Sequence, residues 1–142
     1  MKTIKILFAA FGLICICHAA KASPEETKKT SAKNAVSGFM NAFAEGRLHG
    51  FSQMLDDNVT FTIARAGKIF TYGKSAILKD LKKTADVRQN CETDYTLVKS
   101  LPNQAIFRVD MKYENFTREN YITMIESNDG WKITHITSSF RK

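Results

Sequence analysis

The chain has 142 residues, of which 44% are hydrophobic and 25% are charged, and its 21 lysines and arginines against 14 acidic residues give a formal charge of +7. A chain of this length forms one domain with its own core, and this composition excludes disordered, collagen-like and multi-span membrane proteins. A positive charge is compatible with a nucleic-acid or membrane-surface partner, so its distribution along the chain has to be examined.

Residues 1–22 have the three parts of a secretory signal peptide. A lysine-bearing start precedes an uncharged apolar run over residues 6–17, and Ala20-Lys21-Ala22 offers a small-residue cleavage site. The run is shorter than the roughly 20 apolar residues that span a bilayer. We therefore predict a signal peptide cleaved after Ala22 or Ala20, and an exported protein, periplasmic or secreted, with no membrane association after cleavage.

Removal of this segment changes the charge and the cysteine content. Residues 35–140 contain 13 basic and 12 acidic residues, so the folded body carries +1 and lacks the basic stripe that follows a phosphate backbone. We therefore expect no nucleic-acid partner. Cys91 remains as the single cysteine, which excludes an internal disulfide, and we interpret it as a small, half-buried strand residue.

Residues 23–34 are polar and charged, and they predict a flexible leader before a domain over residues 35–140. The domain begins with a helical pattern, with Ser31 as a plausible N-cap and Gly46 as a stop. Its apolar residues recur at i, i+3, i+4, i+7 and i+8, which gives one buried stripe: Val36, Phe39, Met40, Phe43 and Ala44.

A short second helix over residues 48–55 precedes two strands. Apolar residues alternate over 59–63, and the segment 65–68 turns the chain into a return strand over 69–72. A third helix follows Gly73, with Ile77, Leu78 and Leu81 facing inward.

The remainder of the chain predicts four strands joined by short turns. They cover residues 91–99, 104–114, 120–126 and 131–138, and Asn128-Asp129-Gly130 is a hairpin turn signal. The fold class is therefore α+β: a curved antiparallel sheet, made of a hairpin plus a four-stranded meander, wrapped around a long N-terminal helix with two further short helices.

This order resembles the nuclear transport factor 2-like superfamily over about residues 31–140. The resemblance rests on Ala44-Glu45-Gly46-Arg47 after the first helix, Asp57-Asn58-Val59-Thr60-Phe61 at a strand entry, Gly73-Lys74-Ser75-Ala76-Ile77 before the third helix, and the terminal Gly130-Trp131-Lys132-Ile133. It implies a cone with a pocket open at one end. It does not imply one activity, because members include isomerases, dehydratases, polyketide cyclases, binders and dimerisation modules.

The sequence offers little for metal or phosphate chemistry. It has no glycine-rich phosphate loop and no Gly-x-Ser-x-Gly elbow. Residues 23–142 keep two histidines and one cysteine, without close ligand spacing. We therefore expect no metal and no cofactor.

The favoured hypothesis is a non-catalytic domain that binds a small, largely apolar molecule. Small-molecule sites are usually lined by large apolar and aromatic side chains, with only a few polar groups among them. The residues expected to line the cavity are Phe39, Phe43, Met54, Tyr72, Tyr95, Met111, Tyr113, Trp131 and His135.

Two alternatives remain open. One is a cofactor-free isomerase, dehydratase or cyclase, in which His135 exchanges a proton and Tyr113 donates a hydrogen bond to an oxyanion. Strand alternation places His135 on one face with Trp131 and Ile133. The other is a module without ligand. This module would form a homodimer through the outer sheet face, with apolar contacts from Ile106, Ile122, Met124 and Ile136. A homodimer is also expected under the favoured binding hypothesis.

Overall fold

The computed structural model describes residues 30–142. The predicted signal peptide, residues 1–22, and residues 23–29 of the predicted leader lie outside the described residues. The described part begins at Thr30, which forms a bridge with Gly130 and accepts a hydrogen bond from the Trp131 amide at 2.9 Å. The first helix starts two residues later, inside the segment predicted as a leader.

Helix α1 spans Ala32–Ala44 and is the long helix of the prediction. Ser31 caps it, because its hydroxyl accepts a hydrogen bond from the Asn34 amide at 3.1 Å. The helix ends before Gly46, which has a φ of +68°. Its buried face carries Val36 and Phe39, both fully buried in the core.

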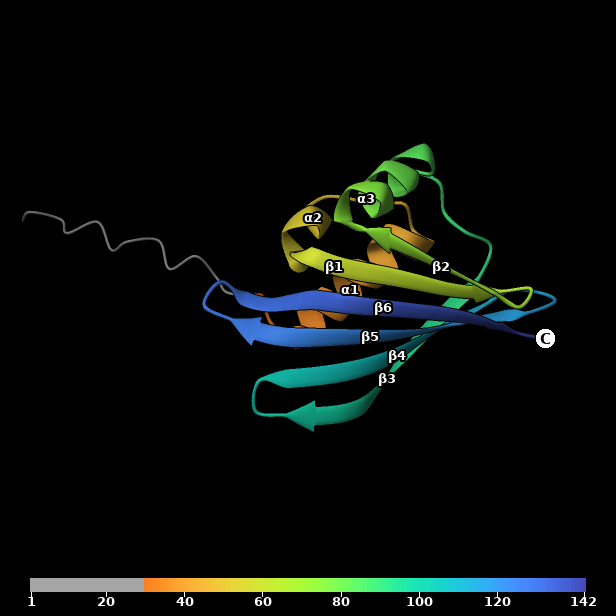
Figure 1. Ribbon diagram of the computed structural model, residues 1–142. Helices are drawn as coiled ribbons and strands as arrows, with labels where there is room; N and C mark the ends of the chain where they lie inside the picture. The colour runs from red at the N-terminus through yellow and green to blue at the C-terminus, as the bar shows by residue number, and fades with distance from the viewer. Residues whose placement is uncertain (1–29) are drawn as a thin grey trace, which may run out of the picture.

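The remaining elements follow the predicted order, as Figure 1 shows. They are α2 (Phe51–Met54), β1 (Leu55–Arg65), β2 (Lys68–Gly73), α3 (Lys74–Lys83), β3 (Glu92–Leu101), β4 (Gln104–Lys112), β5 (Thr117–Ser127) and β6 (Gly130–Arg141).

The six strands form one sheet in the order β2-β1-β6-β5-β4-β3. The hairpin β1–β2 and the meander β3–β6 are antiparallel, as predicted, but β1 and β6 run parallel and join the two parts into a mixed sheet. The prediction of a wholly antiparallel sheet is corrected on this point. The first and last strands of the chain are neighbours in the middle of the sheet, and local sequence pattern does not determine their relative direction.

One face of the curled sheet packs on α1, and the other lies open (Figure 1). On the inner face, Phe107 and Val109 of β4 lie beside Ile122 of β5 and Ile136 of β6, all buried. Helix α3 lies beside β1 and β2 and buries Ile77 and Leu81, as predicted. The core is thus enclosed between α1, α3 and the concave side of the sheet.

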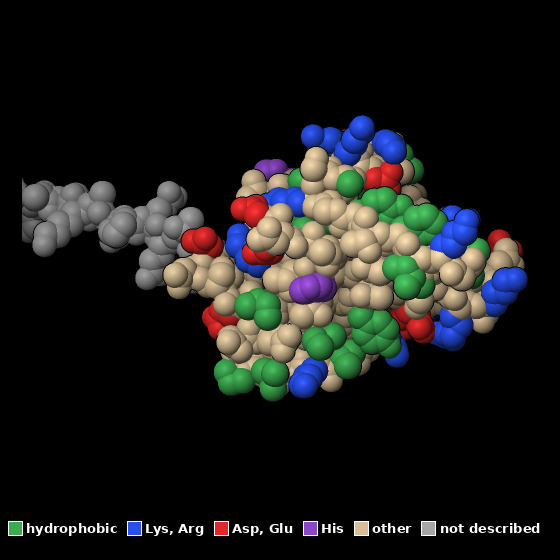
Figure 2. All heavy atoms as spheres, viewed as in Figure 1, with side chains coloured by type: hydrophobic (Ala, Val, Ile, Leu, Met, Phe, Trp, Pro, Cys, Tyr) green, Lys and Arg blue, Asp and Glu red, His purple; other side chains and the backbone are tan. Residues whose placement is uncertain are grey.

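Three of the four residues predicted at an open apolar face belong to this core. Ile122, Met124 and Ile136 are 0–1% exposed. Only Ile106, which pairs with Thr123, lies on the outer face and is partly exposed. The outer face of the sheet is therefore less apolar than predicted. Figure 2 looks onto it and shows hydrophobic side chains scattered among other types.

Candidate functional site

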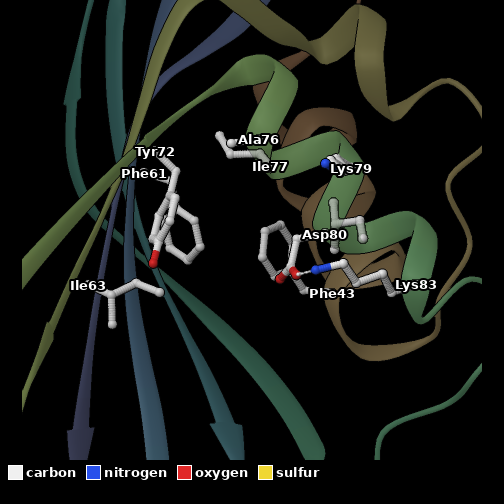
Figure 3. Close-up of a pocket in the computed structure, with 10 residues that line it drawn as sticks. Phe43, Phe61, Ile63, Tyr72, Ala76, Ile77, Lys79, Asp80 and Lys83 are labelled. Atoms are coloured by element: carbon white, nitrogen blue, oxygen red, sulfur yellow. Dashed lines mark hydrogen bonds and ion pairs between the residues drawn. The ribbon is translucent and has the colours of Figure 1, made fainter.

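A pocket of about 320 Å³ lies between α3, the hairpin β1–β2 and the end of α1. Figure 3 shows Phe61, Ile63 and Tyr72 on one side of the gap and Phe43, Asp80 and Lys83 on the other. The pocket is lined by Phe43, Phe61, Ile63, Tyr72, Ala76, Ile77, Lys79, Asp80, Leu81 and Lys83.

Strand alternation and helix periodicity bring these side chains together. Phe61 and Ile63 are two residues apart on β1 and share its inner face, and Tyr72 faces Phe61 directly across the β1–β2 pair. Ile77 and Leu81 are four residues apart on α3 and lie on one side of that helix. The inward faces of these two elements form opposite walls of the pocket.

Aromatic rings make most of the inner wall. Phe43 meets the ring of Phe61 edge-on, with centroids 5.7 Å apart and planes at 78°, and it stacks on Phe39 at 4.3 Å. Tyr72 is tilted against Phe61 at 6.3 Å. Edge-to-face and offset contacts of this kind are the favourable ones for aromatic rings. They hold Phe43 and Phe61 in fixed orientations before any ligand arrives.

A guanidinium lies against the same two rings. Arg118 of β5 has its central carbon 5.3 Å from the centroid of Phe43 and 5.5 Å from that of Phe61. Its Nε and Nη2 both donate to the Ser138 hydroxyl, at 3.4 and 3.3 Å. Ser138 in turn donates to Asn120 Oδ1, and Asn120 Nδ2 donates to the Val109 carbonyl at 3.1 Å. A chain of polar groups therefore crosses the inner face of the sheet.

Arg118 has no close acidic partner. None of the ion pairs found among residues 30–142, at N···O distances up to 4.0 Å, includes it. Burial lowers the pKa of Arg118 below its usual value, which Tyr113 and Asp80 partly oppose. An arginine stays charged at neutral pH even so. A partly exposed positive charge thus lies against two of the rings that border the pocket, although Arg118 itself does not line it.

The rim of the pocket is charged and exposed. Lys83 pairs with Asp80 at 3.0 Å, one helical turn apart on α3, and Lys79 lies on the same side. The pocket lining contains two cations and one carboxylate, and Arg118 beside Phe43 and Phe61 adds a third cation nearby. This balance favours a neutral or anionic occupant over a cationic one.

Only two of the predicted lining residues, Phe43 and Tyr72, border this pocket. Phe39 and Met111 are fully buried in the core instead. Met54 and Trp131 are partly buried and pack against the core. The sequence identifies these side chains as inward-facing, but it does not distinguish a residue that fills the core from one that borders an opening.

The prediction that His135 faces the cavity is wrong. Thr123 pairs with His135 and Met124 pairs with Ile133, so Thr134 has no partner in the ladder and forms a bulge in β6. Ile133 and Ile136 therefore both point into the core, and His135 is exposed on the outer face, with Nδ1 3.1 Å from the Thr134 hydroxyl. Simple alternation from Trp131 gives the opposite result.

Tyr113 and Tyr95 also lie away from the pocket. Tyr113 stacks on Phe116 with centroids 4.6 Å apart and borders a separate shallow depression with Cys91. Burial raises the pKa values of the Tyr113 phenol and of the Cys91 thiol, so both groups are protonated at neutral pH. Tyr95 packs edge-on against Phe107 at 5.9 Å near the outer edge of the sheet.

Sequence reasoning missed the α3 side of the pocket and Arg118. A usable signal for Arg118 is its spacing: Arg118, Asn120, Ile122 and Met124 recur at period two, which places a cation in line with the apolar face of β5. Nothing comparable marks Asp80 and Lys83, since charged residues on an amphipathic helix usually face solvent.

Within residues 30–142, no group of three or more His, Cys, Asp or Glu side chains is placed to hold a metal ion. The helices described there are all too short or too polar to cross a bilayer.

Comparison with protein families gives one match. The family model described as "Putative lumazine-binding" matches residues 27–138. Comparison with curated proteins returns no match.

Solved structures give many matches in fold. A nuclear transport factor 2-like protein of unknown function from Silicibacter pomeroyi has a TM-score of 0.66 at 13% identity, covering 77% of this chain and 92% of its own. A second from Shewanella baltica has 0.62 at 8% identity, covering 78% and 90%. A third from Methylobacillus flagellatus has 0.61 at 16%, covering 78% and 89%. The predicted superfamily resemblance is confirmed at the level of the fold.

Proposed function

The chain belongs to the family described as putative lumazine-binding, and from this membership and the pocket between α3 and β1–β2 we propose that it binds a small, largely apolar, planar molecule without converting it. The observation that carries the proposal is the ring arrangement. Phe43, Phe61 and Tyr72 border one cavity and are held by contacts with each other.

The size of the cavity limits the ligand. Ligand pockets usually measure about 300–1,000 Å³, and this one, at about 320 Å³, lies at the lower end of that range. A molecule of one or two fused rings fits such a space. Lumazine, a bicyclic pteridine, is therefore a suitable first probe for this family.

The absence of conversion is part of the proposal. The acid–base alternative requires His135 and Tyr113 to face one substrate. Tyr113 lies in the connection between β4 and β5, where it stacks on Phe116, whereas His135 is exposed on the outer side of the sheet. A general base has to lie within hydrogen-bond reach of the proton that it removes, and the exposed position of His135 outside the pocket lining does not support that role.

Lumazine fluorescence tests the proposal with a matched pair of variants. Tyr72 and Tyr121 are 40% and 41% exposed and both lie on strands, but only Tyr72 borders the pocket. Tyr72→Ala should weaken lumazine binding by about tenfold, from the loss of one aromatic contact, and Tyr121→Ala should leave it unchanged. Equal affinities for the two variants, or no binding by the native protein at millimolar lumazine, would contradict the site.

The same samples test conversion. Lumazine recovered after prolonged incubation should be chemically intact by mass spectrometry, both with the native protein and with His135→Ala. A product formed by the native protein and absent from the His135→Ala sample would favour the enzyme hypothesis instead.

We further propose that the protein is exported and pairs through its sheet. Export is supported by the signal pattern in residues 1–22, and N-terminal sequencing of protein from its own cells should start after Ala20 or Ala22.

Pairing of two copies of the chain is supported by the outer sheet face, which no helix covers among residues 30–142 (Figure 1). A molecular mass of one chain by light scattering at high protein concentration would exclude it.

A further inference from the structure

The charge of Arg118 is poorly compensated by the protein. Taking a charge out of water costs several kcal/mol unless a counter-charge or hydrogen bonds replace the lost hydration. Its described neighbours are two phenylalanine rings, a serine hydroxyl and, farther off, three groups that oppose the effect of its burial: Tyr113, Cys91 and Asp80. The phenol and the thiol are protonated at neutral pH, and the Asp80 carboxylate is already paired with Lys83 at 3.0 Å. An arginine held in this way has capacity for an anion.

The hydrogen bonds of Arg118 point the same way. A guanidinium has five N–H donors. Two of its nitrogens share one acceptor, Ser138 Oγ, at 3.4 and 3.3 Å, which is long for an N–H···O bond. The other donors find no acceptor within residues 30–142. The Ser138 contact fixes the position of the guanidinium and leaves some of its N–H groups able to donate to another acceptor.

The rings that hold Arg118 are also the rings of the pocket. Phe43 and Phe61 contact the guanidinium and border the cavity at the same time. Arg118 does not itself line the cavity, but a molecule whose ring lies against Phe43 and Phe61 lies near the cation that contacts both rings. Phe140, the direct neighbour of Arg118 across the β5–β6 pair, is 45% exposed and adds apolar surface on the same face.

We propose that the ligand of this pocket is an aromatic carboxylate, whose ring lies against Phe43 and Phe61 and whose carboxylate is held by Arg118. This inference rests on the proposed function, because it specifies the chemical class of the molecule in the same pocket. The planar guanidinium of an arginine suits a carboxylate better than the ammonium of a lysine does, because two of its N–H groups can donate to the two carboxylate oxygens at once. Lys79 and Lys83 at the rim add to the attraction for an anion.

The test uses 2-naphthoate and 2-naphthamide, which share a ring system and differ in charge. Native protein should bind the carboxylate at least about tenfold more tightly, the difference expected for hydrogen bonds to a charged group. Arg118→Gln should reduce this preference to near unity. Arg141→Gln is the matched control, because Arg141 is an exposed arginine paired with Glu119, and it should retain the preference.

Arg118→Lys is a second variant, which keeps the positive charge but removes the planar guanidinium and its paired N–H donors. It should bind 2-naphthoate with an intermediate affinity, and it keeps the test decisive if Arg118→Gln does not fold. Thermal unfolding gives a second readout, in which 2-naphthoate raises the melting temperature of the native protein and of Arg141→Gln but not of Arg118→Gln.

The outcomes separate this inference from the proposed function. If both probes bind equally to native protein and Tyr72→Ala weakens both, the pocket stands and the anionic ligand is excluded. If neither probe nor lumazine binds, both proposals fail. If inorganic phosphate at the same concentration protects the native protein as well as 2-naphthoate does, Arg118 is a simple anion site, and the role of the ring is overturned.

Discussion

Replacement of Gly46 by alanine tests how the pocket-bearing half of the domain is held on α1. Gly46 follows α1 with a φ of +68°, and its carbonyl accepts a hydrogen bond from the Asp86 amide at 2.9 Å. The Gln89 amide donates to the Ala44 carbonyl at 2.7 Å. The segment after α3 is therefore anchored on the end of α1 by main-chain contacts that pass close to Gly46.

Two costs add in this variant. Alanine in the left-handed region costs about 1–2 kcal/mol. The new methyl group would also lie 2.7 Å from the Val87 nitrogen and 2.8 Å from the Thr84 oxygen, where ordinary contacts begin at 3.4 Å, so this backbone has to move by roughly 0.6 Å. Overpacking of this kind costs about 1–3 kcal/mol. The expected loss is about 2–5 kcal/mol of unfolding free energy.

Gly50→Ala is the control that separates the two costs. Gly50 has a φ of +74° but nothing within 4 Å of an added Cβ, so it should lose only the conformational cost, about 1–2 kcal/mol. Urea unfolding followed by circular dichroism measures both variants. Equal losses for the two would refute the role assigned to the backbone contacts around Gly46.

Three further predictions concern other elements. Ala66, at φ +50°, is the first residue of a two-residue hairpin turn, and Ala66→Asn should raise the unfolding free energy by about 0.5–1 kcal/mol because such turns favour asparagine there; no gain in the urea midpoint would contradict this. Ser138→Ala removes the hydroxyl that donates to buried Asn120, and it should cost about 1–3 kcal/mol in the same assay, whereas a neutral result would mean that water replaces the hydroxyl. Lys74 Nζ lies 2.8 Å from Asp57 Oδ1 and lowers the pKa of that carboxyl. The ion pair therefore stabilises the fold fully above the unfolded-state pKa of Asp57, and this stabilisation is lost as the pH falls through the folded-state pKa. An NMR titration should show this pKa rise in Lys74→Met, and an unchanged value would disprove the pairing.

Local pattern was sufficient for the elements of this protein. The helical stripe from Val36 to Ala44 and the Ser31 cap define α1, because both depend on residues within one or two turns of each other. The alternation in 104–112 and the turn at Gly130 define the meander for the same reason. These features also carry the superfamily resemblance, which the fold confirms.

The site depends on relations that local pattern does not contain. The parallel pairing of β1 with β6 joins residues far apart in the chain. It places Ile63, which lines the pocket, beside Ser138, the residue to which Arg118 donates hydrogen bonds. Phe43 and Tyr72 were identified as aromatic and inward-facing, but the opening that they border also has a wall from α3, with Asp80 and Lys83, and only the tertiary structure places that helix.

His135 shows the limit most directly. Strand alternation holds only while every residue has a partner, and a single unpaired residue turns the side chains that follow it to the opposite face. The bulge at Thr134 does this in β6, so that Ile136 and Ser138 point inward and His135 points out. The sequence alone determined which residues form strands and helices. The pairing of β6 with β5 decided which side chains of β6 face the inner side of the sheet, because a bulge is set by contacts between strands and not by the composition of one.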